Sequence, residues 1–334
     1  MSKIKEKILV FRFSAMGDVA MTVPIIREFV EQNKEVELLI VTRHFFSPFF
    51  QSIPNTTIIG VDIENYNGIV GLKKLADELK EYKPTMIADL HNVLRTRFLK
   101  LFLYKYVKKI ATLDKNRKER KLLTRKKNKK LFPLRPVSEC YADVFRKLGF
   151  HLQLSHKLTT SPIKKENSIG IAPFANYKEK MLPLNKMKEI CVNLAKENYH
   201  IFLFGGGKEE SEILDSWQKL HPNIHSLSGK ITLKEQMNCI SQLPVMVTMD
   251  SANMHIASLV GTKVISIWGA THPFAGFLGY GQEQKDIIQN NDLACRPCSI
   301  FGNKTCYRKD WACTRNLDNF DILNKIKDQI MIKN

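Results

Sequence analysis

Residues 244–281 constrain the fold more tightly than any other stretch of the chain. Residues 245–248 are a short apolar run, rich in β-branched side chains, that ends at Asp250, which predicts a buried parallel strand stopping where polar residues begin. Residues 251–260 carry apolar side chains at helical spacing, and residues 263–269 predict a second buried strand. This order of strand, helix and strand predicts half of an open α/β domain.

Polar residues follow both of these strands. Asp250 and Ser251 come after the first strand, and Thr271 comes after the second. In an open parallel sheet, the ligand crevice lies beyond the carboxyl ends of the strands. A helix that begins at Ser251 would direct backbone N–H groups and its positive dipole end toward that crevice, which suits a phosphate. The alternative is that Asp250 and Ser251 only cap the helix.

The amino-terminal residues predict a second unit of the same kind. Residues 8–13 indicate a strand, residues 14–18 a tight turn and residues 19–30 a helix, which is how Rossmann-like units begin. The chain lacks G-x-G-x-x-G at this turn, so the pattern is no dinucleotide fingerprint. Asp18 stands in the first turn of the helix, where it either caps the helix or serves a reaction.

The remaining chain repeats the alternation of strands and helices, which is typical of a doubly wound parallel sheet. The fold class is therefore α/β. A polar connection at residues 151–167 separates two halves, each long enough to bury its own core. The other expected strands are 36–42, 57–62, 85–91, 168–174, 199–204, 224–227 and 286–289, and the other expected helices are 68–82, 93–103, 138–148, 318–332 and those beginning at 185 and 233.

Residues 44–53 are unusually aromatic. Two interpretations remain open for this segment. It packs beneath the sheet, which we favour, or it faces a membrane together with its basic neighbours.

The net charge is +19, from 52 basic and 33 acidic residues. A surface this positive favours an acidic partner, either a nucleic acid, an anionic lipid or a phosphorylated substrate.

Apolar residues make up 44% of the chain, as in ordinary soluble proteins, and no run reaches the ~20 apolar residues that span a bilayer. The chain also begins without a signal-peptide core, so we expect a cytoplasmic protein.

Nine of these net charges fall in residues 114–135, which hold eleven basic and two acidic residues. The segment is a solvated helix face, a nucleic-acid arm or a docking surface for a phosphorylated lipid at the inner membrane. Phe132 is its only aromatic residue, so stacking on bases is poorly supported. We favour the lipid and expect no nucleic-acid partner.

Four cysteines near the carboxyl end follow the pattern C-x2-C-x7-C-x6-C. In a reducing compartment this pattern indicates a structural zinc site, and the alternative is a set of reduced thiols packed in a loop. Four thiolates would leave no open position on the metal, which argues against a catalytic role. The candidate metal ligands are Cys295, Cys298, Cys306 and Cys313.

Two motifs resemble those of glycosyltransferase family 9, the lipopolysaccharide heptosyltransferases. The first is R/K-x-S-x-x-G-D after the first strand, and the second is Asp-Ser/Thr-Gly-x-x-His-x-Ala followed by Gly-x-Thr-x-Pro and Gly-x-Tyr-Gly. Residues 252–254 depart from the second motif, where the family usually has glycine, and Leu182 replaces the tryptophan of a Lys-x-Trp-Pro segment. The matching residues are Arg12, Ser14, Gly17, Asp18, Lys180, Pro183, Asp250, Ser251, His255, Ala257, Gly269, Thr271, Pro273, Gly279, Tyr280 and Gly281.

The resemblance implies a GT-B fold, with two Rossmann-like domains facing a central cleft. Residues 1–155 would bind the acceptor and residues 165–334 the nucleotide sugar. The implied reaction is an inverting, metal-independent transfer of heptose from ADP-heptose to a lipopolysaccharide core acceptor, a phosphorylated lipid at the inner membrane, where the protein would be peripheral. The alternatives are a transferase or epimerase acting on another nucleotide sugar, and a nucleic-acid-binding protein.

The resemblance also implies roles for individual residues. Asp18 would be the general base, and Lys180 would neutralise the donor diphosphate. No cofactor is implied for catalysis. The expected donor-binding residues are Lys180, Asp250, Ser251, Asn253, Met254, His255, Thr271 and Gly205, and the expected acceptor-binding residues are Ser14, Arg95, Arg97, Lys115, Arg117 and Arg120.

Overall fold

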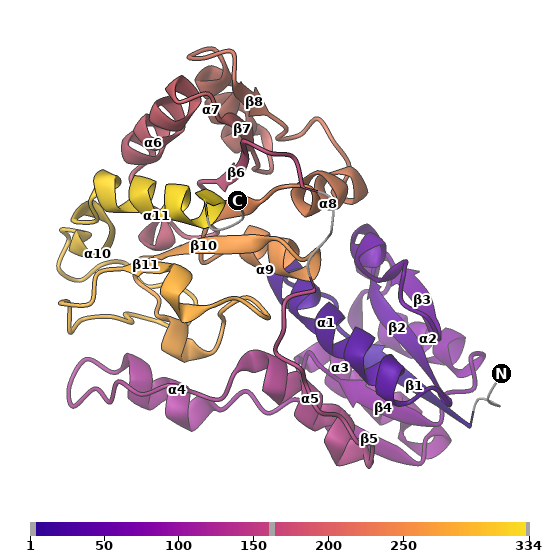
Figure 1. Ribbon diagram of the computed structural model, residues 1–334. Coiled ribbons are helices and arrows are strands. Elements are labelled where there is room, and N and C mark those ends of the chain that lie inside the picture. The colour runs from indigo at the N-terminus through magenta and orange to yellow at the C-terminus, as the bar shows by residue number, and fades with distance from the viewer. Residues whose placement is uncertain (1–4, 160–163, 332–334) are drawn as a thin grey trace. The chain divides into compact units, whose positions relative to one another are not determined.

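The structure, a computed structural model, describes residues 5–159 and 164–331 (Figure 1). The chain separates into two compact units. Unit 1 combines Met1–Lys115 with Val137–Ser155, and unit 2 combines Asn116–Pro136 with His156–Asn334. The basic segment 116–136 therefore belongs to unit 2 by its contacts, although it precedes the expected boundary at residue 155.

Unit 1 is built on a parallel five-stranded sheet with the order β3-β2-β1-β4-β5. Its central strand is apolar and buried because helices cover parallel sheets on both faces. Phe29 and Phe145 stack with ring centroids 4.4 Å apart and join α1 to α5. The strands are β1 (Glu6–Phe11), β2 (Val36–Arg43), β3 (Thr56–Val61), β4 (Met86–Asp89) and β5 (Lys109–Thr112), and the helices are α1 (Met16–Gln32), α2 (Gly68–Lys80), α3 (Leu94–Leu103) and α5 (Val137–Leu148).

Unit 2 is built on a parallel six-stranded sheet with the order β11-β10-β9-β6-β7-β8. Its core is formed by the buried strands β6, β9 and β10 and by the apolar faces of α6 and α11. The strands are β6 (Ser168–Ala172), β7 (His200–Leu203), β8 (Ile224–Ser226), β9 (Val245–Met249), β10 (Lys263–Trp268) and β11 (Ile287–Gln289), and the helices are α4 (Arg117–Thr124), α6 (Leu184–Lys196), α7 (Lys208–Gln218), α8 (Leu233–Ser241), α9 (Ala252–Leu259), α10 (Ala312–Arg315) and α11 (Asn319–Met331).

The predicted strands and long helices are confirmed to within a few residues, and one strand was missed. β5 is a four-residue edge strand that begins with the exposed Lys109, so its sequence shows neither an apolar run nor an alternating pattern. The aromatic segment forms a 3-10 helix, His44–Phe50, in which Phe46, Phe49 and Phe50 are buried and Phe45 is 58% exposed. Most of this segment packs inside unit 1, as we favoured.

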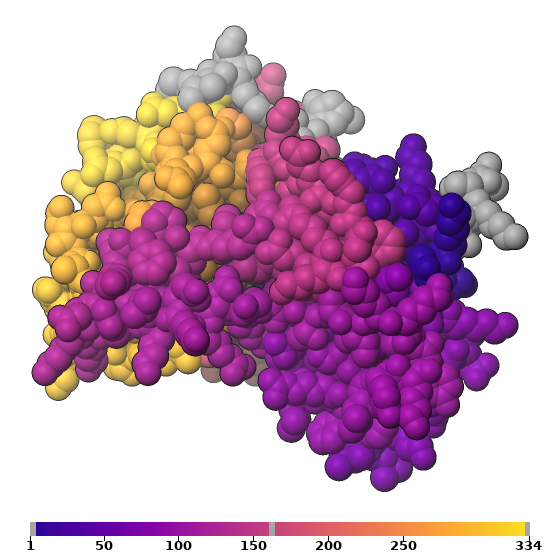
Figure 2. Space-filling view, turned by 90° about the horizontal axis from the view of Figure 1, so that it is seen from below, coloured from indigo at the N-terminus to yellow at the C-terminus, as the bar shows by residue number. Residues whose placement is uncertain are grey.

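The basic segment is a packed part of unit 2. Leu123 and Leu134 are buried against Ala275, and the N–H of Leu134 donates to the carbonyl of Phe274. Figure 2 shows the segment, in purple to magenta, lying along the orange loops that follow β10. Its charges therefore stand on a folded surface, which argues against a detached nucleic-acid arm.

Each sheet has one point where the strand order reverses. In unit 1 the chain runs outward from β1 to β3 and then resumes on the other side at β4. In unit 2 it runs outward from β6 to β8 and resumes at β9. Such switch points leave a crevice at the carboxyl ends of the two central strands, where open α/β domains bind ligands. No helix within the described ranges is long and apolar enough to cross a membrane.

Candidate functional site

The turn after β1 holds an ion pair at the switch point of unit 1. Asp18 Oδ2 lies 2.7 Å from Arg12 Nη2, and the N–H of Ala15 is 3.4 Å from the same oxygen. Arg12 is almost fully buried, and its Nη1 also donates to the carbonyl of Leu90 after β4, at 2.7 Å. The guanidinium therefore ties the turn after β1 to the turn after β4 and fixes the orientation of the Asp18 carboxylate.

Asp89 shapes the turn on the β4 side. Its side chain is fully buried, and Oδ1 accepts from the N–H groups of His91 (3.0 Å) and Asn92 (2.8 Å). Its Oδ2 pairs with Lys100 Nζ at 2.7 Å. This carboxylate serves the backbone of the turn, so Asp89 positions His91 and has no capacity left for chemistry.

His91 lies beside the predicted acceptor-binding residue Ser14. The Nε2 atom of His91 is 3.4 Å from Ser14 Oγ. Burial, followed by the positive charges of Arg12 and Lys115, lowers the pKa of His91 to about 4. His91 is therefore neutral near pH 7. We call the group formed by Arg12, Ser14, Asp18 and His91 the β1–β4 site.

The other predicted acceptor-binding residues are dispersed. Lys115 Nζ donates to the carbonyl of Asn92 at 3.0 Å, which places it at the β4 turn. Arg95 and Arg97 lie on α3 of unit 1, whereas Arg117 and Arg120 lie on α4, which belongs to unit 2. Arg120 stands over the rings of Phe277 and Phe301 at 5.3 and 5.8 Å. The structure thus gathers Ser14 and Lys115 near Asp18 and divides the arginines between the two units.

In unit 2, a second ion pair lies at the switch point. Lys180 Nζ lies 2.9 Å from Asp250 Oδ2, and both side chains are largely buried. Lys180 stands in the loop after β6, and Asp250 follows β9, so the two neighbouring central strands bring them together. Two glycines leave room for the lysine: a Cβ at Gly302 would collide with the Lys180 Cγ and Cδ, and one at Gly269 would meet the Glu179 carbonyl at 2.7 Å.

The start of α9 borders this pair. Ser251 precedes the helix, and its Oγ is 3.0 Å from Thr248 Oγ1 instead of capping the backbone. The backbone N–H groups of the first turn are therefore available to an anion. Met254 differs from the expectation, because its side chain is fully buried and its N–H already donates to the Ser251 carbonyl. Asn253 accepts a hydrogen bond from Gln236 at 3.0 Å.

Thr271 completes this group on the β10 side. Its side chain is fully buried, and within residues 5–159 and 164–331 its hydroxyl has no hydrogen-bond partner. A buried hydroxyl without a partner indicates a missing ligand, since such groups are nearly always satisfied. His255 is also buried, on α9. We call the group formed by Lys180, Asp250, Ser251 and Thr271 the β6–β9 site.

Gly205 begins the glycine-rich loop after β7. The N–H of the next residue, Gly206, donates to Glu210 Oε2 at 2.8 Å. A carboxylate therefore already occupies the start of α7, and burial raises the pKa of Glu210. A carboxyl group at this position competes with a phosphate for the N–H groups of the loop.

Arg296 holds the loop after β10 in place. Its buried guanidinium donates to the carbonyls of Gly269 (2.6 Å), Trp268 (3.0 Å) and Thr271 (2.9 Å). Burial lowers the pKa of Arg296 to about 10. Because Arg296 lies between two of the clustered cysteines, the cysteine loop supports the β6–β9 site through this residue.

The family model of glycosyltransferase family 9 (heptosyltransferase) matches residues 70–306 of the chain. The protein is a member of glycosyltransferase family 9. A lipooligosaccharide heptosyltransferase 2 of Campylobacter jejuni is 24% identical over 332 residues, which cover 96% of this chain and 98% of that protein.

Two solved structures share the fold of this family-9 glycosyltransferase. The family 9 glycosyl transferase of Veillonella parvula superposes with a TM-score of 0.73 at 18% identity, with 99% of both chains covered. The ADP-heptose lps heptosyltransferase II of Escherichia coli superposes with a TM-score of 0.71 at 16% identity and covers 98% of this chain and 99% of its own. The predicted GT-B class, with two parallel-sheet domains, is confirmed.

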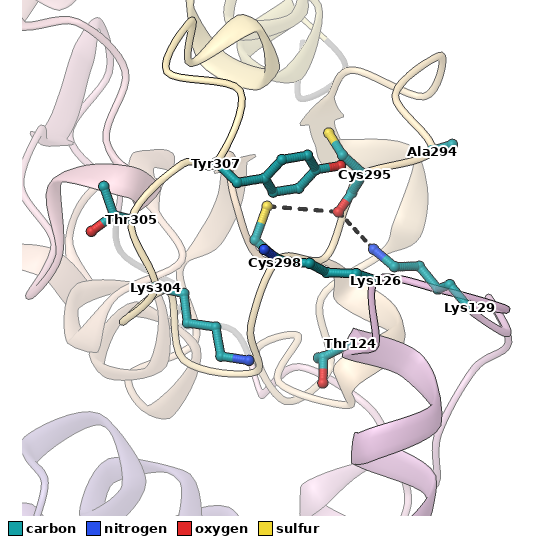
Figure 3. A pocket seen from close by; sticks show the side chains of 9 residues that line it. All are labelled: Thr124, Lys126, Lys129, Ala294, Cys295, Cys298, Lys304, Thr305 and Tyr307. Atoms are coloured by element: carbon teal, nitrogen blue, oxygen red, sulfur yellow. Dashed lines mark hydrogen bonds between the residues drawn. The ribbon is translucent and has the colours of Figure 1, made fainter.

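The four clustered cysteines of the family-9 protein are free thiols. Cys295 and Cys298 line a cavity of about 310 Å³ together with three lysines, and Lys129 donates to the Cys295 carbonyl at 2.6 Å (Figure 3). Burial raises the pKa of Cys298, and that of Cys313 to about 11.

Across the described ranges, no group of three or more His, Cys, Asp or Glu side chains is arranged to hold a metal ion. Zinc binding by Cys295, Cys298, Cys306 and Cys313 stays a prediction for elemental analysis of the purified protein.

Two positioning residues escaped sequence reasoning. Arg296 carries no periodic or motif signal, and the only hint was its place between paired cysteines. Asp89 was not singled out either, because its full burial and its bonds to the following turn depend on the sheet.

Proposed function

We propose that this family-9 glycosyltransferase moves a heptose from ADP-heptose to a lipopolysaccharide core acceptor with inversion at the anomeric carbon. The observation that carries the proposal is the β6–β9 site, where a buried lysine, the start of a helix and an unpartnered hydroxyl converge. Both the C. jejuni relative and the E. coli structural neighbour are heptosyltransferases, and the latter is described as using ADP-heptose, which supports this choice of sugar and donor.

The donor half of the reaction needs a group that accepts the charge of the leaving diphosphate. Lys180 and the first N–H groups of α9 supply this charge, so no divalent metal is required. Asp250 holds Lys180 in place before the donor arrives. When the diphosphate takes over the ammonium group, the Asp250 carboxylate becomes available to accept hydrogen bonds from sugar hydroxyls.

The acceptor half needs a base for the attacking hydroxyl. Asp18 is that base, and its ion pair with Arg12 holds the carboxylate in one orientation. The hydroxyl oxygen bonds to the anomeric carbon while the bond to the diphosphate oxygen breaks, and the bonding electrons leave on the diphosphate. An aspartate is a far weaker base than an alkoxide, so the proton passes to Asp18 late, as the new bond forms.

The acceptor is a phosphorylated lipid at the inner face of the inner membrane, where the protein binds peripherally. The excess positive charge of the chain supports an acidic acceptor, and Lys115 beside the β4 turn is a basic residue near Asp18.

The test is a transfer assay with purified protein, a heptose-deficient core acceptor and a panel of ADP-, GDP- and UDP-sugars, each with and without EDTA. We expect mass spectrometry to find one added heptose with ADP-heptose alone, at a rate that EDTA leaves unchanged. Transfer from a GDP- or UDP-sugar would move the protein to another donor class, and epimerisation without transfer would replace the proposed reaction.

A further inference from the structure

The segment 94–109 of unit 1 combines apolar and basic residues without any acidic one. Its sequence, LRTRFLKLFLYKYVKK, contains six lysines and arginines and no Asp or Glu. It comprises α3, the 3-10 turn Tyr104–Tyr106 and the start of β5. Such a composition is typical of helices that lie in a membrane interface.

Only some of the apolar side chains of this segment are buried in the folded unit. Thr96, Leu99 and Leu103 of α3 are buried in unit 1, whereas Leu94 and Leu101 are 68% and 58% exposed. These two exposed leucines lie seven positions apart, on one face of the helix. A single exposed leucine is ordinary on a protein surface, so these two matter only if they belong to a larger apolar patch.

The exposed face extends onto the neighbouring elements. Ile69 and Val70, at the start of α2, are 58% and 83% exposed, and α2 packs against α3. Tyr104 and Tyr106, after α3, are 53% and 59% exposed. We call the surface formed by Ile69, Val70, Leu94, Leu101, Tyr104 and Tyr106 the α2–α3 surface.

A groove connects the two helices within this surface. It has a volume of about 520 Å³ and is lined by Ile69 and Leu72 of α2 and by Leu94, Arg95 and Phe98 of α3. The groove places the exposed Ile69 of α2 beside the exposed Leu94 of α3, so apolar side chains of the two helices are contiguous at this end of the surface. Contiguous apolar patches on a protein surface mark sites of interaction, whereas scattered ones do not.

The charges around the surface decide which partner fits. Arg97 and Lys105 are exposed on the segment that carries the leucines and tyrosines, and Lys108 is exposed but pairs with Glu6 at 3.0 Å. The acids on α2 are engaged locally, since Asp77 pairs with Lys80 at 2.6 Å and Glu78 accepts from Tyr66 at 2.6 Å. An apolar surface rimmed by cations is complementary to an anionic bilayer, whose phosphates pair with the cations while its acyl chains receive the apolar side chains.

We propose that the α2–α3 surface docks the protein on an anionic phospholipid bilayer. The aliphatic side chains enter the interface, and the tyrosines lie at the depth of the headgroups, where aromatic residues concentrate. The inference rests on the proposed function, because an enzyme with a lipid-linked acceptor works at the bilayer. We place the main docking element here and not on the basic segment 116–136, where Leu123 and Leu134 are buried and Leu131, 53% exposed, is the exposed large apolar side chain among many cations.

The first experiment measures binding of the full-length protein to vesicles of phosphatidylglycerol and phosphatidylethanolamine by co-sedimentation. The variant is Leu94→Gln with Leu101→Gln, and the matched control is Leu220→Gln, which changes a leucine 50% exposed in unit 2. We expect the double variant to bind at least tenfold more weakly and the control to bind like wild type. Phosphatidylcholine vesicles should bind all three proteins weakly, because they lack net charge.

The second experiment separates docking from catalysis. Turnover is measured with the acceptor embedded in vesicles and with a delipidated core acceptor in solution. We expect the double variant to lose most turnover on vesicles and to match wild type in solution. Absence of transfer by all proteins on both acceptors would contradict the proposed function and leave docking to be judged by co-sedimentation.

Three outcomes would overturn the docking proposal. One is equal vesicle binding by wild type and the double variant. Another is loss of binding in a variant of the basic segment, Lys126→Gln with Lys127→Gln, without loss in the leucine variant. The third is a dimer in analytical ultracentrifugation that the leucine substitutions dissociate, which would assign the surface to a second copy of the chain.

Discussion

The two strand-end sites have similar parts but are assembled differently. In the β1–β4 site both partners of the ion pair, Arg12 and Asp18, come from one turn and lie 2.7 Å apart. In the β6–β9 site the partners, Lys180 and Asp250, come from loops after two different strands and lie 2.9 Å apart. The first pair is a local property of its turn, whereas the second pair depends on β6 and β9 pairing in the sheet.

The carboxylates also differ in exposure, which matches the chemistry proposed for them. The Asp18 side chain is 29% exposed, whereas that of Asp250 is only 7% exposed. A base must reach a hydroxyl on an incoming acceptor, so it needs access. A carboxylate that holds a lysine for the donor gains from burial, because the ion pair is stronger where water is scarce.

Replacing the base gives the largest expected effect. Asp18→Asn keeps the shape of the side chain and removes the proton acceptor, so we expect turnover to fall about 10²- to 10⁴-fold. Binding of ADP, measured by calorimetry, should stay within twofold of wild type, because the donor site is in unit 2. The matched control is Glu31→Gln, an exposed acid at the end of the same helix. Turnover of Asp18→Asn within threefold of wild type would remove Asp18 from the mechanism.

Removing the charge of Lys180 should give an intermediate effect, and the effect should be on donor binding instead of turnover. Lys180→Met keeps the aliphatic stem and removes the charge, so we expect ADP to bind about 10- to 100-fold more weakly. Lys178→Met is the control, because Lys178 is exposed in the same loop and lies 5.9 Å from the Trp311 ring. Unchanged ADP affinity in Lys180→Met, with an unchanged melting temperature, would show that the diphosphate binds elsewhere.

The third expected effect concerns stability instead of the reaction, at the buried histidine of each strand end. Burial, with nearby cations, lowers the pKa of His91 in unit 1 and of His272 in unit 2 to about 4. Each histidine binds a proton in the unfolded chain below about pH 6.5 that the folded chain takes up only near pH 4. Stability should therefore fall as the pH falls from 6.5 to 4, by up to about 1.4 kcal/mol per pH unit for each histidine.

Urea unfolding at pH 7.5, 6.5 and 5.5 would test this expectation. His91→Gln and His272→Gln should each show a shallower loss of stability toward low pH than wild type, because each variant lacks one titrating group. Above pH 7 the dependence on pH should be the same in all three proteins. An unchanged slope in His91→Gln would mean that His91 titrates near its ordinary pKa in the folded protein.

The contrast between a local ion pair and one that depends on strand pairing also explains which features the sequence could predict. Arg12 and Asp18 are close in the chain, so their motif predicted the position of Asp18 at a strand end, and the structure adds the ion pair. Lys180 and Asp250 were each identified from their motifs, but nothing in either motif indicated their contact. Arg296 was missed because its role, holding carbonyls beyond β10, exists only when the cysteine loop folds back.

In two segments, charged residues also left the sequence without a clear signal of the structure that forms. Lys109 begins the short edge strand β5, which was missed because a strand with one exposed edge needs no continuous apolar run. In the basic segment, Leu123 and Leu134 are its buried contacts among many cations, so the sequence suggested a solvated surface more strongly than a packed one. Tertiary packing determines the structure of both segments, and the periodicity of a sequence says little about tertiary packing.

The glycines beside Lys180 have a consequence for how the protein recognises its donor. A lysine usually samples many rotamers and loses that freedom when it binds a phosphate. Here the lack of a Cβ at Gly302 leaves space for the lysine stem, and the ion pair with Asp250 holds its ammonium group at 2.9 Å. The entropy of ordering this cation is then lost before any nucleotide arrives, so the charge is preorganised and its full attraction is available to the transition state.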